Sequence, residues 1–158
     1  MKVAGIDYSS FAIDIVLIDA YTDTPPEWHR YALSGHDAFE RARTVTTAMP
    51  SKGSAFWDTV LAVGLEEPRG RNSAPIHRVQ GAILAAIPGR VLVQPWLPNE
   101  WRTAVGLKGN ASKDAAAWRS RQLQPRFMDP LCEWPQDAHD AHLIAIATRT
   151  RLNQQEAA

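Results

Sequence analysis

The sequence has one cysteine, no long apolar run and no net charge. Cys132 alone excludes an internal disulfide, and a single thiol is too little for a cysteine zinc site. No apolar stretch approaches the roughly 18 residues of a membrane span. Asp7 interrupts the first apolar stretch, MKVAGIDYSS, too early for a signal peptide. We therefore expect a cytoplasmic protein.

The chain has the length and composition of one globular domain. Its 158 residues are enough to bury one core. Apolar residues make up 45% and charged residues 22%, as is typical of globular proteins. We find no internal repeat, low-complexity segment or linker, so residues 1–158 are expected to form a single domain.

The zero net charge hides an uneven distribution. Residues 1–68 hold 5 Lys and Arg against 10 Asp and Glu, whereas residues 69–121 hold 9 against 2. Residues 122–158 are again acidic, with 3 against 5. A basic middle between acidic ends favours a phosphate-binding face beside a cluster of carboxylates, although charge also varies along chains without function.

Hydrophobic periodicity, glycines and prolines predict an α/β domain. The first strands form a meander, and later strands alternate with helices, which favours a mixed five-stranded sheet with helices on its faces. The expected strands are residues 2–7, 12–19, 28–34, 59–67 and 91–95. The expected helices are residues 37–48, 73–87, 97–105, 112–123 and a last one that begins near Gln136 and runs to residue 152.

Acidic residues stand at the ends of two predicted buried strands. Asp7 ends the strand KVAGID, where burial of a carboxylate is unfavourable unless it is paired, hydrogen-bonded or bound to a metal. Glu66 and Glu67 end the strand LAVGL. Side chains alternate across a strand, so only one of the two glutamates faces the site. We favour Glu66, which directly follows the apolar run, with Glu67 as the alternative.

A second acidic pair opens the last predicted helix. In WPQDAHDAHLIAIA, Asp137 and Asp140 are three residues apart and share one helix face. Acids also favour helix N-termini for the helix dipole alone, but that effect explains one such residue better than two. His139 is offset from both acids, and we expect it on the solvent side of the helix; a role in proton transfer or metal binding is the alternative.

The four carboxylates of Asp7, Glu66, Asp137 and Asp140 are the predicted metal ligands and catalytic residues. Hard oxygen donors of this kind suit Mg²⁺ or Mn²⁺ and not zinc. Two such ions, roughly 3.5–4 Å apart, activate a water and stabilise the leaving oxygen of a phosphodiester.

Three motifs in this order resemble RuvC-type Holliday-junction resolvases across nearly the whole chain. VAGIDYSS resembles their first strand, VGLEEP their second acidic strand, and DAHDAHLIAIA their C-terminal helix. RVQGAILAAI resembles the helix that follows the second acid. The resemblance implies an RNase H-like fold, a homodimer and magnesium-dependent cleavage of branched DNA, above all four-way junctions.

The resemblance also implies phosphate-binding residues in the basic middle. Arg102 and Lys113 stand where the family has two lysines, with Lys108 close by. The chain departs from the family at Arg69, three residues after Glu66, where cellular resolvases carry an aromatic residue that stacks on junction bases. A guanidinium also stacks on bases, so we count Arg69 among the DNA-binding residues. This relaxed pattern resembles phage-encoded members, for which the compartment is the host cytoplasm.

Other functions remain open at this point. An RNase H or an exonuclease uses a similar acidic set, and a DNA-binding module without catalysis uses the same basic segment. Actin-like ATPases share the Gly-Ile-Asp strand, but 158 residues are too few for their two lobes. The apolar stripe of the helix Ser73–Ile87 either forms the dimer contact or covers the sheet. Most of the six tryptophans are expected in the core or a dimer interface.

Overall fold

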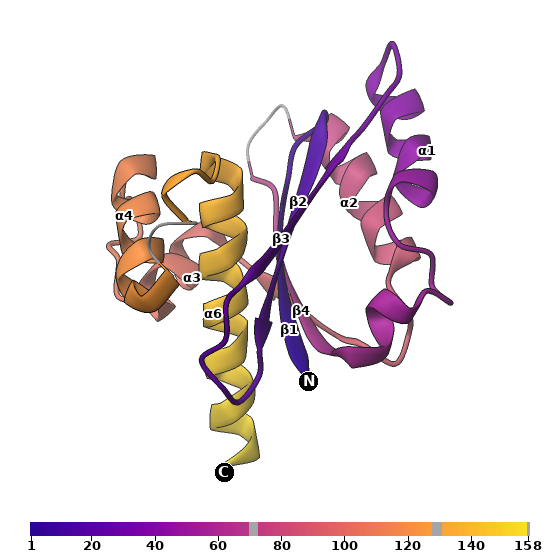
Figure 1. Ribbon diagram of the computed structural model, residues 1–158. Helices are drawn as coiled ribbons and strands as arrows, with labels where there is room; N and C mark the ends of the chain where they lie inside the picture. Colours follow the sequence, from indigo (N-terminus) through magenta and orange to yellow (C-terminus); the bar gives the residue numbers. More distant parts are fainter. Residues whose placement is uncertain (70–72, 128–130, 158) are drawn as a thin grey trace.

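The computed structural model describes residues 1–69, 73–127 and 131–157. Its strands form a five-stranded sheet in the order β3-β2-β1-β4-β5 (Figure 1). β1 pairs antiparallel with β2, and β2 with β3, whereas β4 runs parallel to both β1 and β5. The strands are β1 (Lys2–Tyr8), β2 (Ala12–Asp19), β3 (Glu27–Ala32), β4 (Val60–Glu66) and β5 (Leu92–Trp96).

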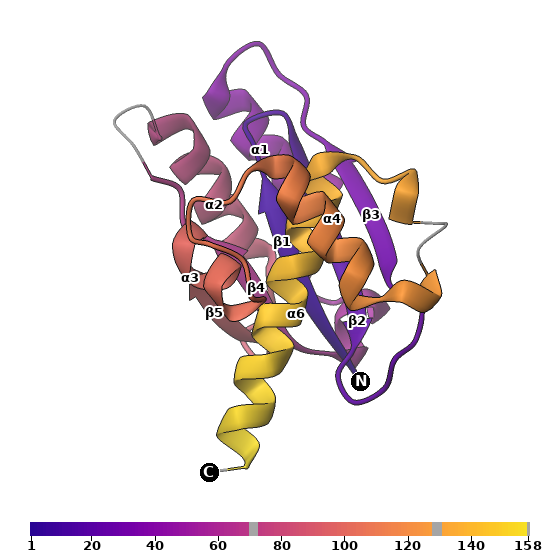
Figure 2. The ribbon, with the colours of Figure 1, turned by 90° about the vertical axis from the view of Figure 1, so that its left-hand side faces the viewer.

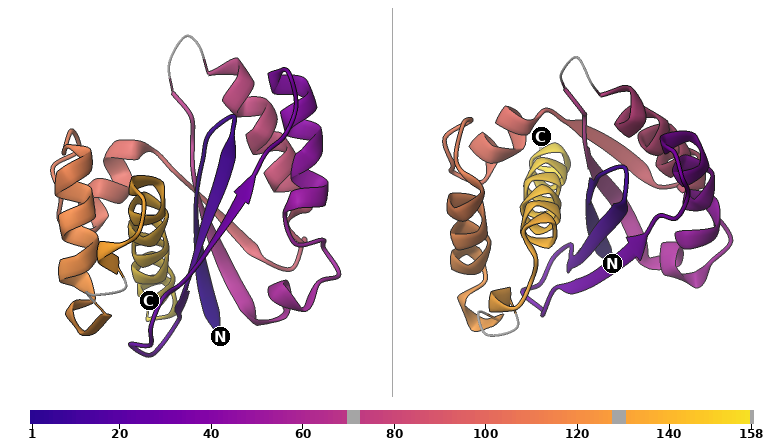
Figure 3. Two further views of the ribbon diagram at one scale, coloured as in Figure 1. Left: turned by 45° about the horizontal axis from the view of Figure 1, so that its top comes forward. Right: turned by 90° about the horizontal axis from the view of Figure 1, so that it is seen from above.

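Helices cover both faces of the sheet (Figures 1 and 3). One layer holds α1 (Ala38–Ala48) and α2 (Ala74–Ala86), and the other holds α3 (Pro98–Ala104), α4 (Lys113–Leu123) and α6 (Gln136–Glu156). Figure 2 shows α6 lying along the sheet with α4 outside it. The mixed sheet with helices on both faces confirms the predicted fold class, with strands and helices close to their expected bounds.

Two short segments were not predicted as helices. The 3₁₀ turns η1 (Ala55–Thr59) and η2 (Pro125–Phe127) follow the ends of α1 and α4. The last helix also reaches Glu156, beyond the apolar run that defined it in the sequence. No helix in the described part of the chain is long and apolar enough to cross a membrane.

Alternating side chains of β2 build two separate cores. Ile13, Ile15 and Leu17 pack into the layer of α1 and α2. Val16 and Ile18 point the other way and pack against α6. The strand is apolar on both faces because helices cover both, which explains why AIDIVLID reads as a nearly continuous apolar run.

The apolar stripe of α2 belongs to the first of these cores. Val79 and Ile83 are fully buried and Ile87 is 4% exposed. The stripe consists of Ile76, Val79, Ile83 and Ile87, and of these only Ile76 is partly exposed. The stripe therefore covers the sheet, and the alternative that it forms the dimer contact is wrong in this fold. Of the tryptophans, Trp57, Trp96 and Trp101 are core residues, as expected, but Trp118 is 59% exposed.

Helix α6 lies directly on the backbone of β1 and β4. A Cβ atom at Gly5 would be 1.9 Å from the carbonyl oxygen of Ala141, and one at Gly64 would be 2.1 Å from Oγ1 of Thr148. Only glycine permits this approach. The close packing fixes the register of α6 on the sheet, and with it the height at which the first turns of α6 meet the strand ends.

Candidate active site

Asp7 and Glu66 stand side by side at the carboxyl ends of two neighbouring parallel strands. β1 and β4 pair with Ile6 opposite Leu65, so the next residue on each strand is an acid. Gly5 and Gly64 both face α6, and the two-residue period of a strand puts Asp7 and Glu66 on that same face. Both acids therefore lie under the start of α6.

The direction of α6 brings the second acidic pair to the same edge. The N-terminus of β1 and the C-terminus of α6 lie at one end of the molecule (Figure 1), so the end of β1 and the start of α6 share the other. Asp140 precedes Ala141, whose carbonyl lies on Gly5. The pKa of Asp7 is raised well above its usual value, first by burial and then by the charges of Asp140, Glu66 and Asp137, in that order.

Glu66 is held by hydrogen bonds at the edge of this group. The indole Nε1 of Trp101 donates to its Oε2 at 2.5 Å, and the Tyr8 hydroxyl donates to its backbone carbonyl at 2.7 Å. Burial raises the pKa of Glu66, while Trp101, Arg102 and Lys113 act to lower it. The charge of Glu66 acts on both Asp7 and Asp140, which supports the choice of Glu66 over Glu67.

Asp140 is 8% exposed and has one hydrogen-bond donor, the side-chain amide of Gln136 at 3.0 Å. Burial raises its pKa to about 6, and the charge of Glu66 adds to the rise. In the described residues none of Asp7, Glu66 and Asp140 forms an ion pair. The charges of Arg102 and Lys113 act to lower the pKa of Glu66 and of Asp140, but burial outweighs them and both pKa values stay raised.

The chemistry of this donor set fits a hard divalent cation. Carboxylate oxygens are the ligands that Mg²⁺ and Mn²⁺ prefer, and a cation would relieve the repulsion that raises these pKa values. Throughout the part of the chain that the structure describes, however, no three Asp, Glu, His or Cys side chains lie close enough to hold a metal ion as they stand. Metal binding by the four acids therefore stays a prediction.

A buried carboxylate that the sequence analysis missed lies next to Asp7. Asp14 on β2 is directly opposite Asp7 and is 1% exposed. It accepts hydrogen bonds from Nε1 of Trp28 at 2.8 Å and from Nη1 of Arg30 at 3.4 Å. Burial raises the pKa of Asp14 despite these donors. The available signal was a lone acid on the α6-facing side of an apolar strand.

The prediction for His139 is wrong, because its side chain is buried between α6 and α4. It is 2% exposed, and its Nδ1 lies 2.9 Å from the Ser120 hydroxyl, which also meets Nδ1 of His142 at 2.8 Å. Burial lowers the pKa of His139 to about 4 and that of His142 to about 3. Both rings are neutral parts of the packing between the two helices.

Two of the four predicted DNA-binding residues face the acids. The charges of Arg102 and Lys113 act to lower the pKa of both Glu66 and Asp140. Arg69 is exposed and lines a pocket of about 150 Å³ together with Asp7, Tyr8, Glu66, Pro68 and Ile76. Lys108 is exposed, in the loop between α3 and α4.

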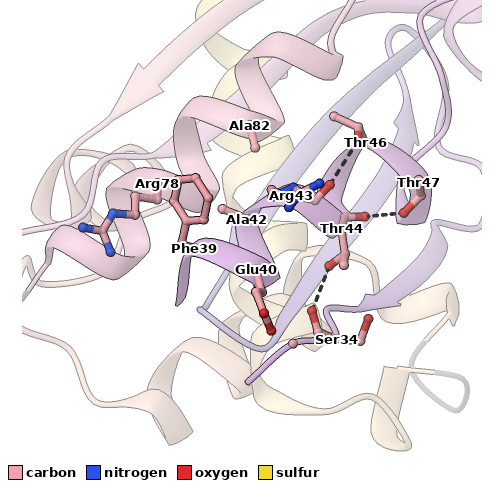
Figure 4. A pocket seen from close by; sticks show the side chains of 11 residues that line it. Ser34, Phe39, Glu40, Ala42, Arg43, Thr44, Thr46, Thr47, Arg78 and Ala82 are labelled. Carbon is pink, nitrogen blue, oxygen red and sulfur yellow. Dashed lines mark hydrogen bonds between the residues drawn. The ribbon is translucent and has the colours of Figure 1, made fainter. Parts of the chain in front are cut away.

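A larger pocket, of about 920 Å³, lies elsewhere, on the layer of α1 and α2 (Figure 4). None of the predicted site residues lines it. The hydroxyls of Thr44, Thr46 and Thr47 in its wall donate to backbone carbonyls one turn earlier in α1. These three hydroxyls are thus engaged locally, and the acidic edge remains the candidate site.

The raised pKa of Asp140 predicts how stability depends on pH in the presence of a chelator. Between the unperturbed value of 3.8 and about 6, folded Asp140 keeps a proton that the unfolded chain releases. Its contribution to the free energy of unfolding is therefore present at low pH and is lost as pH rises through about 6. The replacement Asp140→Asn should recover about 3 kcal/mol above pH 7, at about 1.4 kcal/mol for each pKa unit.

Thermal unfolding with chelator at about pH 5 and about pH 8 measures this effect. The asparagine variant should exceed the parent in Tm by several degrees at the higher pH and by less at the lower. An equal difference in Tm at both pH values would show that ionisation of Asp140 does not destabilise the folded protein.

Comparison with known proteins supports the fold. No family model and no curated protein matches the chain. Among solved structures, RuvC from Thermus thermophilus superimposes with a TM-score of 0.66 at 20% identity, covering 98% of this chain and 97% of that one. T. thermophilus RuvC in complex with a Holliday-junction substrate gives 0.68 at 17% identity, covering 98% and 96%. Fowlpox virus resolvase with substrate Holliday-junction DNA gives 0.51 at 13% identity, covering 96% and 99%. The chain therefore has the fold of the RuvC-like Holliday-junction resolvases over nearly its whole length.

Proposed function

We propose that the chain is a metal-dependent endonuclease that cuts branched DNA, with the four-way junction as its main substrate. The observation that carries the proposal is the placement of Asp7 and Glu66 at neighbouring strand ends, under the start of the helix that bears Asp137 and Asp140. The charges of the other three acids all act to raise the pKa of Asp7. Negative charge gathered at this edge repels a DNA backbone unless a cation accompanies it. The two neighbours solved with Holliday-junction DNA support the choice of substrate.

In this proposal the four acids hold two Mg²⁺ ions, for which Mn²⁺ is the alternative. The ions would supply an activated water and stabilise the leaving oxygen of the scissile phosphodiester. Trp101 and Gln136 orient the carboxylates of Glu66 and Asp140 through their hydrogen bonds. Arg102 and Lys113 border the acids and offer positive charge to the phosphates on either side of the cleavage point.

The test is cleavage of a labelled four-way junction beside duplex, flap and RNA–DNA hybrid, with Mg²⁺, with Mn²⁺ and with chelator. Metal-dependent paired nicks in the junction would support the proposal. Preferred cutting of the hybrid would indicate an RNase H, and stepwise shortening of duplex ends an exonuclease. Junction binding without cleavage under any metal condition would indicate a non-catalytic DNA-binding module.

A junction has two strands to cut, so we propose that the enzyme acts as a homodimer with two sites related by a two-fold axis. The buried stripe of α2 cannot supply the contact. Sedimentation at the protein concentration of the cleavage assay measures the oligomeric state directly. A chain that cuts both strands while it sediments as a monomer would contradict this part of the proposal.

The basic residues beside the acids should determine how DNA binding depends on salt. Each phosphate contact that is lost lowers the slope of log affinity against log salt by about one. We expect Arg102→Ala and Lys113→Ala each to show this change, with affinity for all DNA forms reduced alike. Lys108→Ala and Arg69→Ala extend the series.

Arg90→Ala is the matched control for this measurement. Arg90 pairs with Asp58 at 2.7 Å in the turn before β5, at the opposite end of the sheet from the acids. Its replacement should leave the slope unchanged. An unchanged slope for both Arg102→Ala and Lys113→Ala would place the DNA on another face.

A further inference from the structure

We propose that Arg30, anchored by the buried Asp14, is a positioning residue for Asp137. The inference rests on the proposed function, because it assigns Asp137 a place in that site. It concerns a pair of residues on β2 and β3 that no motif of the sequence picked out.

Strand register places these residues in one row across the sheet. Arg30 on β3 is directly opposite Asp14 on β2, which is directly opposite Asp7 on β1. Residues paired in this way point to the same face, here the face covered by α6. The row therefore runs from Arg30 at the sheet edge to the acidic site.

Asp14 holds the guanidinium of Arg30 in place by an ion pair. One terminal nitrogen of Arg30, Nη1, lies 3.3 Å from Oδ2 of Asp14, and the other, Nη2, lies 3.8 Å from Oδ2 of Asp137. Trp28 Nε1 donates to Oδ1 of Asp14 at 2.8 Å, and Nη1 of Arg30 also donates to this oxygen at 3.4 Å, so the anchor itself has a fixed direction. A planar guanidinium bridges two carboxylates with separate nitrogens, whereas an ammonium is a single point charge.

Asp137 is held by an ion pair with Arg30, whereas the other three acids are each held by a hydrogen bond. Asp7 accepts from the backbone N–H of Tyr8, Glu66 from Trp101, and Asp140 from Gln136. Asp137 has 38% of its side chain accessible, and Arg30 is its ion-pair partner among the described residues. Partners that orient a ligand in this way contribute about 10–100-fold to metal affinity or activity.

The test is a double-mutant cycle between Arg30→Gln and Asp137→Asn. Arg30→Gln alone should lower kcat for junction cleavage about tenfold or more. It should also weaken Mn²⁺ binding, measured by calorimetry on the DNA-free protein. In the Asp137→Asn background, Arg30→Gln should change both quantities by no more than about twofold, because no carboxylate is left to position. Arg30→Lys should recover less than half of the loss, since a single ammonium does not reproduce two fixed nitrogens that each face one carboxylate.

Three results would overturn the proposal. Additive losses in the cycle, with Tm lowered equally in both backgrounds, would mean that Arg30 only stabilises the edge strand. A lower salt slope of DNA binding in Arg30→Gln, with Mn²⁺ affinity unchanged, would make it a phosphate contact. Full activity in Asp14→Asn would show that Arg30 does not need Asp14 as an anchor. If the parent chain binds Mn²⁺ but cuts no DNA, the proposed function fails while the Mn²⁺ cycle still tests the positioning.

Discussion

Replacement of Asp7 or Asp140 by asparagine should lower the rate of junction cleavage by more than about 100-fold and leave junction binding intact. Groups that only orient a metal ligand already contribute about 10–100-fold, so loss of a ligand should exceed this. The amide keeps the size of the side chain but removes a charge that the neighbouring acids oppose. Binding should be retained or tighter, because each change removes negative charge near the phosphates.

The measurement pairs single-turnover cleavage with a binding titration on the same labelled junction. Asp58→Asn is a suitable control, since Asp58 is an exposed acid that pairs with Arg90 away from the site. It should cut at the parental rate. Near-normal cleavage by Asp7→Asn would show that the carboxylate at the end of β1 takes no part in catalysis, and the nuclease proposal would then fail.

Replacement of Gly5 or Gly64 by alanine should destabilise the domain severely. The added Cβ would lie 1.9 Å from a backbone oxygen of α6 in the first case and 2.1 Å from Thr148 Oγ1 in the second. Overpacking of a core ordinarily costs about 1–3 kcal/mol. A clash with backbone admits no rotamer change, so Gly5→Ala should be at or above the top of this range. Gly64→Ala should be milder, because the two nearest atoms, Thr148 Oγ1 and Ile144 Cγ2, belong to side chains.

Gly81→Ala is the matched control, because nothing lies within 4 Å of a Cβ built at this exposed position of α2. It should raise the free energy of unfolding by about 1 kcal/mol, the helix-propensity difference between alanine and glycine. Denaturant unfolding of the three variants measures their free energies of unfolding and so the order of their stabilities. If Gly5→Ala were as stable as the parent, α6 would not lie on β1 as described, and the meeting of Asp140 with Asp7 would lose its basis.

The sequence was enough to predict the fold because local signals and global pattern agree. AIDIVLID is an apolar segment of strand length, the prolines after α1 and α2 end these helices, and the acids at the start of α6 mark its first turn; packing preserves all three. Asp7 and Glu66 could be paired in advance because an acid that ends a buried apolar strand is conspicuous. The two turns η1 and η2 lack any periodicity, so they had no comparable signal.

What the sequence could not provide was contact between distant segments. Asp14 becomes significant only when register places it opposite Asp7, and Arg30 only when it reaches Asp137. His139 was expected on the solvent side because it is offset from the acids on its helix. The sequence does not show that α4 packs on that side, where Ser120 contacts His139. Trp101 lies 35 positions from Glu66, and no spacing rule connects them.

The two outer strands of the sheet, β3 and β5, bear on self-association. An exposed strand edge is a template for pairing with another chain, and proline or inward-facing charge on the edge suppresses such pairing. β5 carries Pro95, which has no N–H to offer a new partner. β3 carries Arg30, whose side chain turns inward to Asp14. The arginine that we propose as a positioning residue thus has a second consequence: together with Pro95 it disfavours the growth of the sheet by pairing of its outer strands with neighbouring chains.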